Sequence, residues 1–241
     1  MKQHLKALAA IMLLSLTFIV AGCGPENDSN NKGGDNGGNI YNGHEYVDLD
    51  LPSGTLWATC NVGANTPEGY GDYFAWGETA PKTTYNWNMY KYCIGDYNQL
   101  TKYSNDGSFG YNGFTDNLTV LQPSDDAATA NWGSGWCMPT KAQWEELFNN
   151  TTNQWINQNS VNGRLFTASN GNSFFLPAAG YRWDDEFGHA GSDGYYWSCS
   201  LYTDTPNRAW RFFFNSGRYR TSYDGRIFGQ SVRAVRSSRQ N

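Results

Sequence analysis

The sequence contains little of what most enzymes use for catalysis. Histidine occurs only three times in 241 residues, as His4, His44 and His189. This scarcity excludes a histidine-rich metal site and leaves a catalytic triad few residues to use. The sequence also lacks a CxxC pair, a G-x-S-x-G elbow, a Walker loop and an H-E-x-x-H motif. These absences argue against zinc-ribbon, α/β-hydrolase, P-loop and zincin chemistry, and we predict neither a cofactor nor a metal.

Charge is also scarce, and its two signs are unevenly distributed. Charged residues make up 16% of the chain, as do aromatic residues, and the net charge is −5. From Arg208 to the end, eight arginines against the single acid Asp224 give +7, whereas the preceding 207 residues carry nine basic and 21 acidic groups, giving −12. Such an asymmetry is typical of an interaction surface rather than of a requirement of the fold.

Only one long apolar run is present, and it lies at the N-terminus. The run from Leu8 to Val20 comes after a basic start and ends in Ala21-Gly22-Cys23. It is shorter than the roughly 20 residues that a membrane-spanning helix needs. This pattern predicts a lipoprotein signal peptide over residues 1–22, with Cys23 lipidated and anchoring an exported protein to the outer membrane. An ordinary signal peptide with a chance cysteine is the alternative.

Composition divides the rest of the chain into a tether, a domain and a short tail. Residues 24–43 are mostly Gly, Asn and Asp, a composition that cannot bury enough apolar surface to fold. We therefore predict a disordered tether over 23–43. Because no repeat or Pro-rich linker interrupts the next stretch of chain, residues 44–236 are predicted to form one domain, and 237–241 a tail.

Short apolar runs bounded by turn residues predict an α+β domain. Strands are predicted at 45–51, 55–62, 172–182, 194–201, 209–214 and 230–236. One helix is predicted over 124–130, capped by Ser124 and ended by Gly133. A capping box at Thr140 predicts a second helix through WEELFNN. Residues 63–123 are rich in turns and aromatics and are expected to form an irregular, packed region.

Four cysteines come after Cys23 and allow three disulfide pairings. They are Cys60, Cys93, Cys137 and Cys199. Export makes disulfides feasible, but the spacings do not choose among the pairings. We favour Cys60–Cys93 with Cys137–Cys199, and free buried thiols are the alternative.

Alternation in the closing stretch RAWRFFFNSGRYR (208–220) predicts which side chains face a partner. In a strand, Trp210, Phe212 and Phe214 share one face, predicted to be core, and Arg211 and Phe213 share the other. Aromatic and arginine side chains outside a core are those that carry binding energy at interfaces. The alternative is an exposed hairpin whose arginines only solubilise it and pair with the acidic body.

One acidic run suggests a different chemistry. Asp184-Asp185-Glu186 with His189 has the residue types of an acid–base or metal site, although neighbouring glycines favour a solvated loop. Nucleic acid is not an expected partner, because an exported acidic protein does not meet it.

Several blocks of sequence resemble a known family. They are YVDLDLPSGTLWATCNVGA (46–64), GDYFAWGET (71–79), DDAATANWGSGWCMPTKAQWEEL (125–147), NGNSFFLPAAGYR (170–182) and the closing FGQSVRAVR. Together they resemble exported Bacteroidetes proteins with the Fibrobacter succinogenes major paralogous domain. That family is similar to the formylglycine-generating-enzyme-like branch of the C-type lectin fold. The resemblance implies two helices, short antiparallel sheets, long loops, and N- and C-terminal strands that lie close together.

The resemblance also implies a ligand-binding surface. In some members of this branch, a retroelement rewrites a C-terminal region at adenines of asparagine codons. Here a frame of YYWS (195–198), A-W-x-F-x-F-N, Arg226 and G-x-S-V-R-A-V-R encloses nine positions that resemble the rewritten ones. These variable positions are Tyr202, Arg208, Arg211, Phe213, Arg218, Arg220, Ser222, Tyr223 and Phe228. The paired cysteines of the enzymes are missing from the closing block, so no enzymatic activity is implied.

The sequence supports three hypotheses. The first is a non-enzymatic, lipid-anchored envelope protein that binds a protein or glycan ligand through the variable positions. The second is an enzyme acting on cell-surface polysaccharide with Asp184, Asp185 or Glu186. The third is a structural or adhesive component of the envelope.

Overall fold

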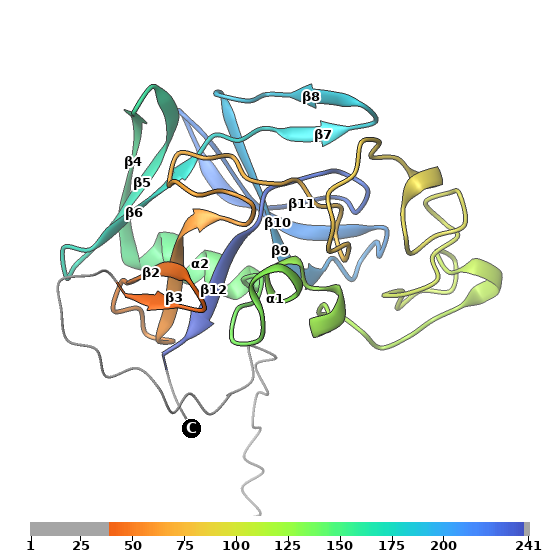
Figure 1. Cartoon of the computed structure of the whole chain (residues 1–241). Coiled ribbons are helices and arrows are strands. Elements are labelled where there is room, and N and C mark those ends of the chain that lie inside the picture. The colour runs from red at the N-terminus through yellow and green to blue at the C-terminus, as the bar shows by residue number, and fades with distance from the viewer. Residues whose placement is uncertain (1–38, 239–241) are drawn as a thin grey trace, which may run out of the picture.

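A computed structural model describes residues 39–238 (Figure 1). The predicted signal peptide and the lipidation site Cys23 lie outside the described residues. Over residues 39–238 the architecture is α+β, as predicted, with two α-helices and four small antiparallel sheets. No helix within residues 39–238 combines the length and apolar character needed to cross a membrane.

The first sheet joins the two ends of the described chain. Its strands are β1 (Ile40–Tyr41), β2 (His44–Asp48), β3 (Thr55–Asn61) and β12 (Arg233–Ser237), in the order β1-β2-β3-β12. The N- and C-terminal strands therefore lie together, as the resemblance implied. Strand β1 falls within the range assigned to the tether, so the ordered chain includes residues 39–43.

The second sheet carries most of the variable positions. It has the order β11-β10-β9, with β9 at Asp193–Leu201, β10 at Arg208–Asn215 and β11 at Tyr219–Gly225. Phe212 and Phe214 are fully buried, as alternation predicts, in a core that includes Trp144 and Leu147. Trp210, predicted to share that core, is only half-buried.

Two hairpins, β4–β5 (residues 151–168) and β7–β8 (residues 181–188), form in residues that were not predicted, or only partly predicted, to be strands. The third sheet contains β4 (Thr151–Gln158), β5 (Val161–Ala168) and β6 (Ser173–Pro177). Asn159 and Ser160 join β4 to β5 with φ of 47° and 68°, as a two-residue hairpin turn requires. Strands β7 (Tyr181–Trp183) and β8 (Glu186–Gly188) form the fourth sheet.

Both helices form where they were expected, but one cap differs. Helix α2 (Lys141–Asn150) has the predicted capping box between Thr140 and Gln143. Helix α1 (Ala127–Trp132) ends at Gly133, as predicted, but its N-cap is Asp126 and not Ser124. Ser124 instead lies in the 3₁₀ turn η3 (Pro123–Asp125). Asp126 is the cap because its buried carboxylate accepts from the N–H groups of Thr129 and Met138.

Residues 63–123 are irregular, as predicted. The later part of this segment packs at one end of the molecule (Figure 1), whereas its early part reaches the β4–β5 turn, where Glu68 accepts from Gln158 and Asn159. Besides isolated bridges, the segment contains two 3₁₀ turns, η1 (Trp87–Met89) and η2 (Tyr111–Gly113). The carboxylate of Asp125 helps to fix this segment by accepting from Lys102 Nζ at 2.6 Å and Tyr103 Oη at 2.7 Å. Burial alone would raise the pKa of Asp125, but hydrogen bonds from Lys102 and the tyrosines outweigh it and lower the pKa to about 2.

Arg226 connects the closing segment to the irregular one. Its side chain is fully buried. Nε donates to Tyr90 Oη at 2.8 Å, while the two Nη atoms donate to the carbonyls of Tyr103 (3.0 Å), Pro206 (2.9 Å) and Lys102 (3.0 Å). Burying a guanidinium is costly unless most of its N–H groups are hydrogen-bonded, and four such bonds offset that cost for Arg226.

Arg233 has the corresponding role in the first sheet. It is also fully buried, and it donates to Asn61 Oδ1 at 2.9 Å and to the carbonyls of Ala58 and Thr59 at 3.0 and 2.9 Å. Burial lowers the pKa of Arg233 to about 10, so the group stays charged at neutral pH. Two of the C-terminal arginines are therefore core residues.

Neither predicted disulfide forms. Cys60, Cys93 and Cys199 are free thiols. Cys199 is buried on β9 inside the aromatic core, and the Cys93 thiol donates to the Trp87 carbonyl at 2.9 Å. The predicted pairing is wrong because these thiols lie in separate parts of the fold, where each packs as a small apolar group.

Replacing Arg226 by alanine should lower the free energy of unfolding by more than about 4 kcal/mol, because several buried acceptors lose their donor at once. The matched control is Arg220→Ala on exposed β11, which should change it by less than about 0.5 kcal/mol. Urea unfolding followed by tryptophan fluorescence measures both. A loss below about 1 kcal/mol for Arg226→Ala would show that Arg226 does not hold the two segments together.

Candidate ligand-binding site

The frame and the variable positions differ in burial. The buried frame residues are Ala209, Phe212, Phe214, Arg226, Ser231, Val232, Arg233, Ala234 and Val235. Among the variable positions, Arg208, Arg218, Arg220 and Tyr223 are exposed, and Tyr202, Arg211, Ser222 and Phe228 are half-buried. Only Phe213, 6% exposed, is buried. The frame thus supplies the core, and most variable side chains reach the surface.

Strand register divides the variable positions between two faces of the second sheet. In the β10–β11 pair, Tyr223 lies opposite Trp210, while Ser222 lies opposite Arg211 and Arg220 opposite Phe213. Directly opposed residues point to the same face. Tyr223 and Trp210 therefore share the α2 side, whereas Arg211, Phe213, Arg220 and Ser222 share the other side. The variable positions do not form one continuous patch.

An aromatic cluster lies on the α2 side. The rings of Tyr202 and Tyr223 stack with centroids 4.0 Å apart, and Trp210 meets Tyr202 edge-on at 5.1 Å. The Arg208 guanidinium lies 5.3 Å from the centre of the Tyr223 ring, and Lys141 Nζ lies 4.6 Å from that of Trp210. These contacts hold the aromatic rings in place without removing them from the surface.

Arg211 and Phe213 are corrections to the predicted binding surface. Arg211 Nη1 pairs with Asp224 Oδ2 at 2.5 Å, and the two side chains are only 15% and 25% exposed. Burial raises the pKa of Asp224, and the Arg211 charge opposes that rise. Phe213 packs against Tyr195 with ring centroids 5.2 Å apart. Alternation identifies the face correctly but cannot show that Tyr195 covers part of it.

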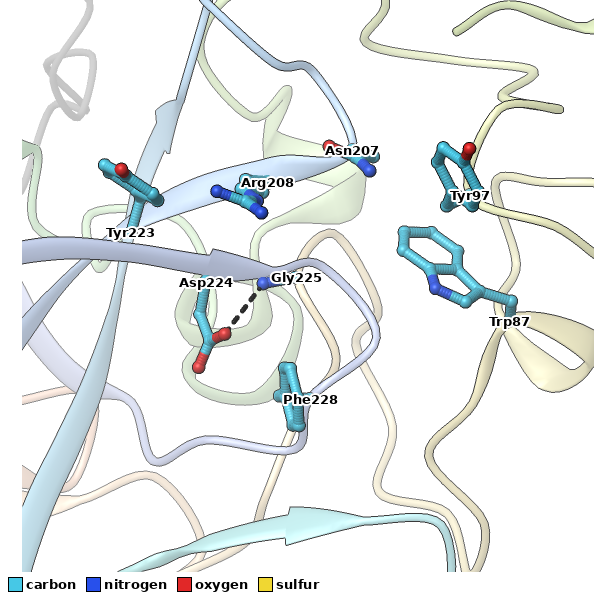
Figure 2. Close-up of a pocket in the computed structure, with 8 residues that line it drawn as sticks. All are labelled: Trp87, Tyr97, Asn207, Arg208, Tyr223, Asp224, Gly225 and Phe228. Carbon is cyan, nitrogen blue, oxygen red and sulfur yellow. Dashed lines mark hydrogen bonds between the residues drawn. The ribbon is translucent and has the colours of Figure 1, made fainter.

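A hollow of about 410 Å³ lies where β10 and β11 meet the irregular segment (Figure 2). Of the variable positions, Arg208, Tyr223 and Phe228 line it. The other lining residues are Trp87, Tyr97, Asn207, Asp224 and Gly225. Trp87 and Tyr97 face the closing segment from the opposite side. Sequence reasoning missed both, because their segment showed only an excess of aromatics and turns. Arg218 and Arg220 do not line this hollow.

The acidic run lies at the tip of the β7–β8 hairpin, with Asp184 and Asp185 in the turn and Glu186 as the first residue of β8. Asp185 and Glu186 are exposed, and Asp184 Oδ1 accepts from Asn86 Nδ2 at 2.9 Å. His189 Nδ1 instead lies 3.0 Å from Asp193 Oδ2. Within residues 39–238, no group of three or more His, Cys, Asp or Glu side chains is arranged to hold a metal ion. The run is an exposed hairpin tip and does not line the hollow.

Asp224→Ala should lower the free energy of unfolding by about 2 kcal/mol, since it leaves Arg211 without its carboxylate in a largely buried place. The partial exposure of both side chains keeps the loss below that of a fully buried pair. Removing both partners, as Arg211→Ala with Asp224→Ala, should cost less than the sum of the two single changes. Chemical unfolding of the four proteins measures the coupling, and strict additivity would show that the ion pair contributes nothing.

No protein-family model, curated protein or solved structure matches this chain. Its function therefore has to be inferred from its own residues and geometry.

Proposed function

We propose that this chain is an exported, lipid-anchored protein of the cell envelope that binds a protein or glycan ligand without enzymatic activity. In this proposal it belongs to the Fibrobacter succinogenes major paralogous domain family, and its domain is C-type-lectin-like. Cys23 carries the lipid, and ligand recognition takes place at the closing segment. The surrounding α+β architecture and the joined ends of the chain support the assignment.

The hollow beside β10 and β11 carries the proposal. Its volume of about 410 Å³ falls in the range of small-molecule and recognition sites. Arg208, Tyr223 and Phe228 reach it from the variable positions. Aromatic rings provide contact area at low entropic cost, and an exposed guanidinium provides forked hydrogen bonds. These are the properties of a surface that binds a polar ligand.

The buried frame explains how such a surface tolerates change. Arg226 and Arg233 fix the closing segment through hydrogen bonds that no exposed variable side chain makes. Substitution at Arg208 or Tyr223 then alters the surface while the core keeps its contacts. This separation is what diversification by a retroelement requires.

An enzymatic function has less support. A glycosidase needs two carboxylates facing each other across a cleft at roughly 5–10 Å. Asp185 and Glu186 lie at the exposed tip of a hairpin, and the closing block lacks the paired cysteines of the enzymes that it resembles. A purely structural role does not require the aromatic hollow.

The double variant Arg208→Ala with Tyr223→Ala should lose at least tenfold in ligand affinity, because both side chains line the hollow. Its free energy of unfolding should change by less than about 1 kcal/mol. The matched control is Arg218→Ala with Arg220→Ala, which removes two exposed arginines outside the hollow. All three proteins are tested on arrays of immobilised oligosaccharides and of extracellular proteins. Binding by the first variant equal to that of the unsubstituted chain, or no binding to either array, refutes the proposal.

The DNA beside the gene tests diversification separately. We expect a near-copy of its 3′ end that differs only at adenines, next to a reverse transcriptase gene. The differences should fall in the codons of the nine variable positions and spare those of Arg226 and Arg233. Sequencing the locus decides the question, and a locus without such a copy makes this a static member of the family.

A further inference from the structure

The two sides of the hollow are built differently. Trp87 and Tyr97 come from the irregular segment, while Tyr223 and Phe228 come from the closing segment (Figure 2). Tyr97 is 47% exposed and Tyr223 39%. Aromatic rings left open to water on two sides of a hollow provide flat apolar surfaces against which a ring-shaped ligand can lie.

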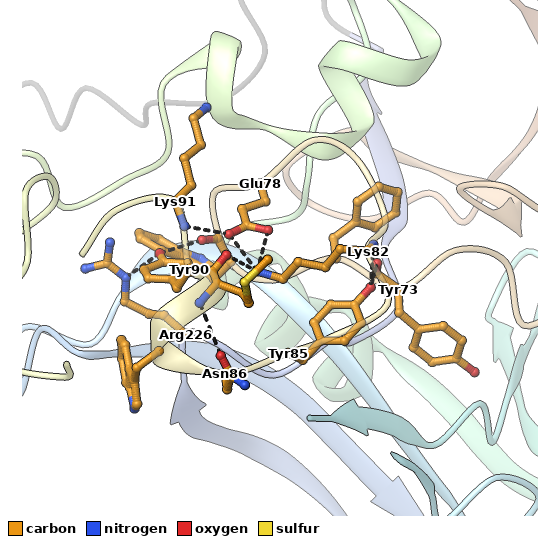
Figure 3. Close-up of polar contacts among 12 residues, drawn as sticks. Tyr73, Glu78, Lys82, Tyr85, Asn86, Tyr90, Lys91 and Arg226 are labelled. Atoms are coloured by element: carbon orange, nitrogen blue, oxygen red, sulfur yellow. Dashed lines mark hydrogen bonds and ion pairs between the residues drawn. The ribbon is translucent and has the colours of Figure 1, made fainter. Parts of the chain in front are cut away.

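Trp87 is held rigidly although it lies outside regular secondary structure. The Asn86 side chain caps its 3₁₀ turn by accepting from Met89 N at 3.1 Å. Lys82 Nζ donates both to Glu78, which is nearly buried, and to the Met89 carbonyl, each at 2.9 Å (Figure 3). The Trp87 ring packs edge-on against Tyr90, which Arg226 fixes. The Trp87 ring is therefore preorganised.

The polar groups of the hollow differ in how far the protein already satisfies them. Arg208 lies over the Tyr223 ring and makes no salt bridge to any residue in 39–238. Asp224 is compensated by Arg211 and also accepts from Gly225 N at 2.9 Å and Gln230 Nε2 at 3.2 Å. Asp224 can therefore accept a further hydroxyl group without presenting an uncompensated negative charge. Arg208 is the cation left for an anionic group.

This combination selects among ligand classes. A lipid or a purely aromatic ligand would not use the hydrogen-bonding groups of Asp224 and Asn207 that line the hollow, and a cationic ligand would be repelled by Arg208. A pyranose ring has an apolar face of C–H groups for the aromatic rings and hydroxyls around its edge for Asp224 and Asn207. A carboxylate on that ring matches the planar fork of the guanidinium.

We infer that the hollow binds an acidic saccharide whose ring lies against Trp87 or Tyr97 and whose carboxylate pairs with Arg208. This inference rests on the function proposed above and specifies the ligand of the same site. It also adds Trp87 and Tyr97, which lie outside the closing segment, to the binding residues. Because a charge-assisted contact contributes, added salt should weaken binding.

Titration of the full chain with oligomers of a hexuronic acid and with the matching neutral hexose oligomers tests the inference. Isothermal calorimetry should show at least tenfold tighter binding of the acidic oligomer. Arg208→Gln should remove this preference, and Trp87→Ala should weaken binding of the acidic oligomer at least tenfold. Tyr111→Ala, at an exposed tyrosine of the same irregular segment outside the hollow, should bind like the unsubstituted chain.

Stability controls and alternative outcomes keep the test decisive. Because Trp87 packs on Tyr90, the unfolding of the Trp87→Ala variant is measured in parallel. If Trp87→Ala fails to fold, the variant Tyr97→Ala takes its place. Equal binding of acidic and neutral oligomers overturns the pairing with Arg208. Binding of no saccharide, together with a protein ligand that depends on Arg208 and Tyr223, overturns the inference but leaves the proposed function standing. Binding of neither class refutes both.

Discussion

The hydrogen bonds of one buried arginine determine where the candidate site forms. Arg226 leaves water without a carboxylate partner among residues 39–238, and it is satisfied by Tyr90 Oη and three carbonyl groups. Burying a guanidinium is costly unless most of its N–H groups find acceptors. The irregular segment, which has little regular secondary structure of its own, must therefore come to Arg226. That requirement brings Trp87 and Tyr97 to the end of β10 and β11.

The charge asymmetry of the sequence has more than one physical cause. Arg226 and Arg233 are core donors, Arg211 is compensated by Asp224, and Arg208, Arg218 and Arg220 are exposed. A count of charges along the chain cannot distinguish these roles, because each depends on contacts with distant residues. The excess of arginine therefore has two sources. Some arginines are exposed on a surface, and others are buried and donate to backbone carbonyl groups of irregular segments in the core.

Local patterns predicted the elements whose signals are local. Short apolar runs bounded by turn residues located β9, β10 and β12, alternation assigned the two faces of β10, and the capping box located α2. The β4–β5 hairpin was missed because TTNQWINQ carries polar residues on both faces, so that no clear alternation is visible. The N-cap of α1 was placed two residues early, since Ser124 and Asp126 are both good caps and only burial beside Met138 decides between them. The disulfide pairing failed because spacing says nothing of distance in space.

The site was predictable only on one of its sides. The resemblance predicted Arg208, Tyr223 and Phe228, which lie in or beside regular strands, whereas alternation pointed to Arg211 and Phe213, which do not line the hollow. Trp87 and Tyr97 precede them by more than a hundred residues and have no periodic pattern, so only their place in the three-dimensional structure, in the lining of the hollow, reveals them. If ligand binding occurs here as proposed, the two sides have different freedom to change. The Trp87 side is fixed by the contacts that hold the core, whereas Arg208 and Tyr223 make few such contacts. Substitutions at Arg208 and Tyr223 would then alter the specificity, while Trp87 would keep each new ligand in the same place.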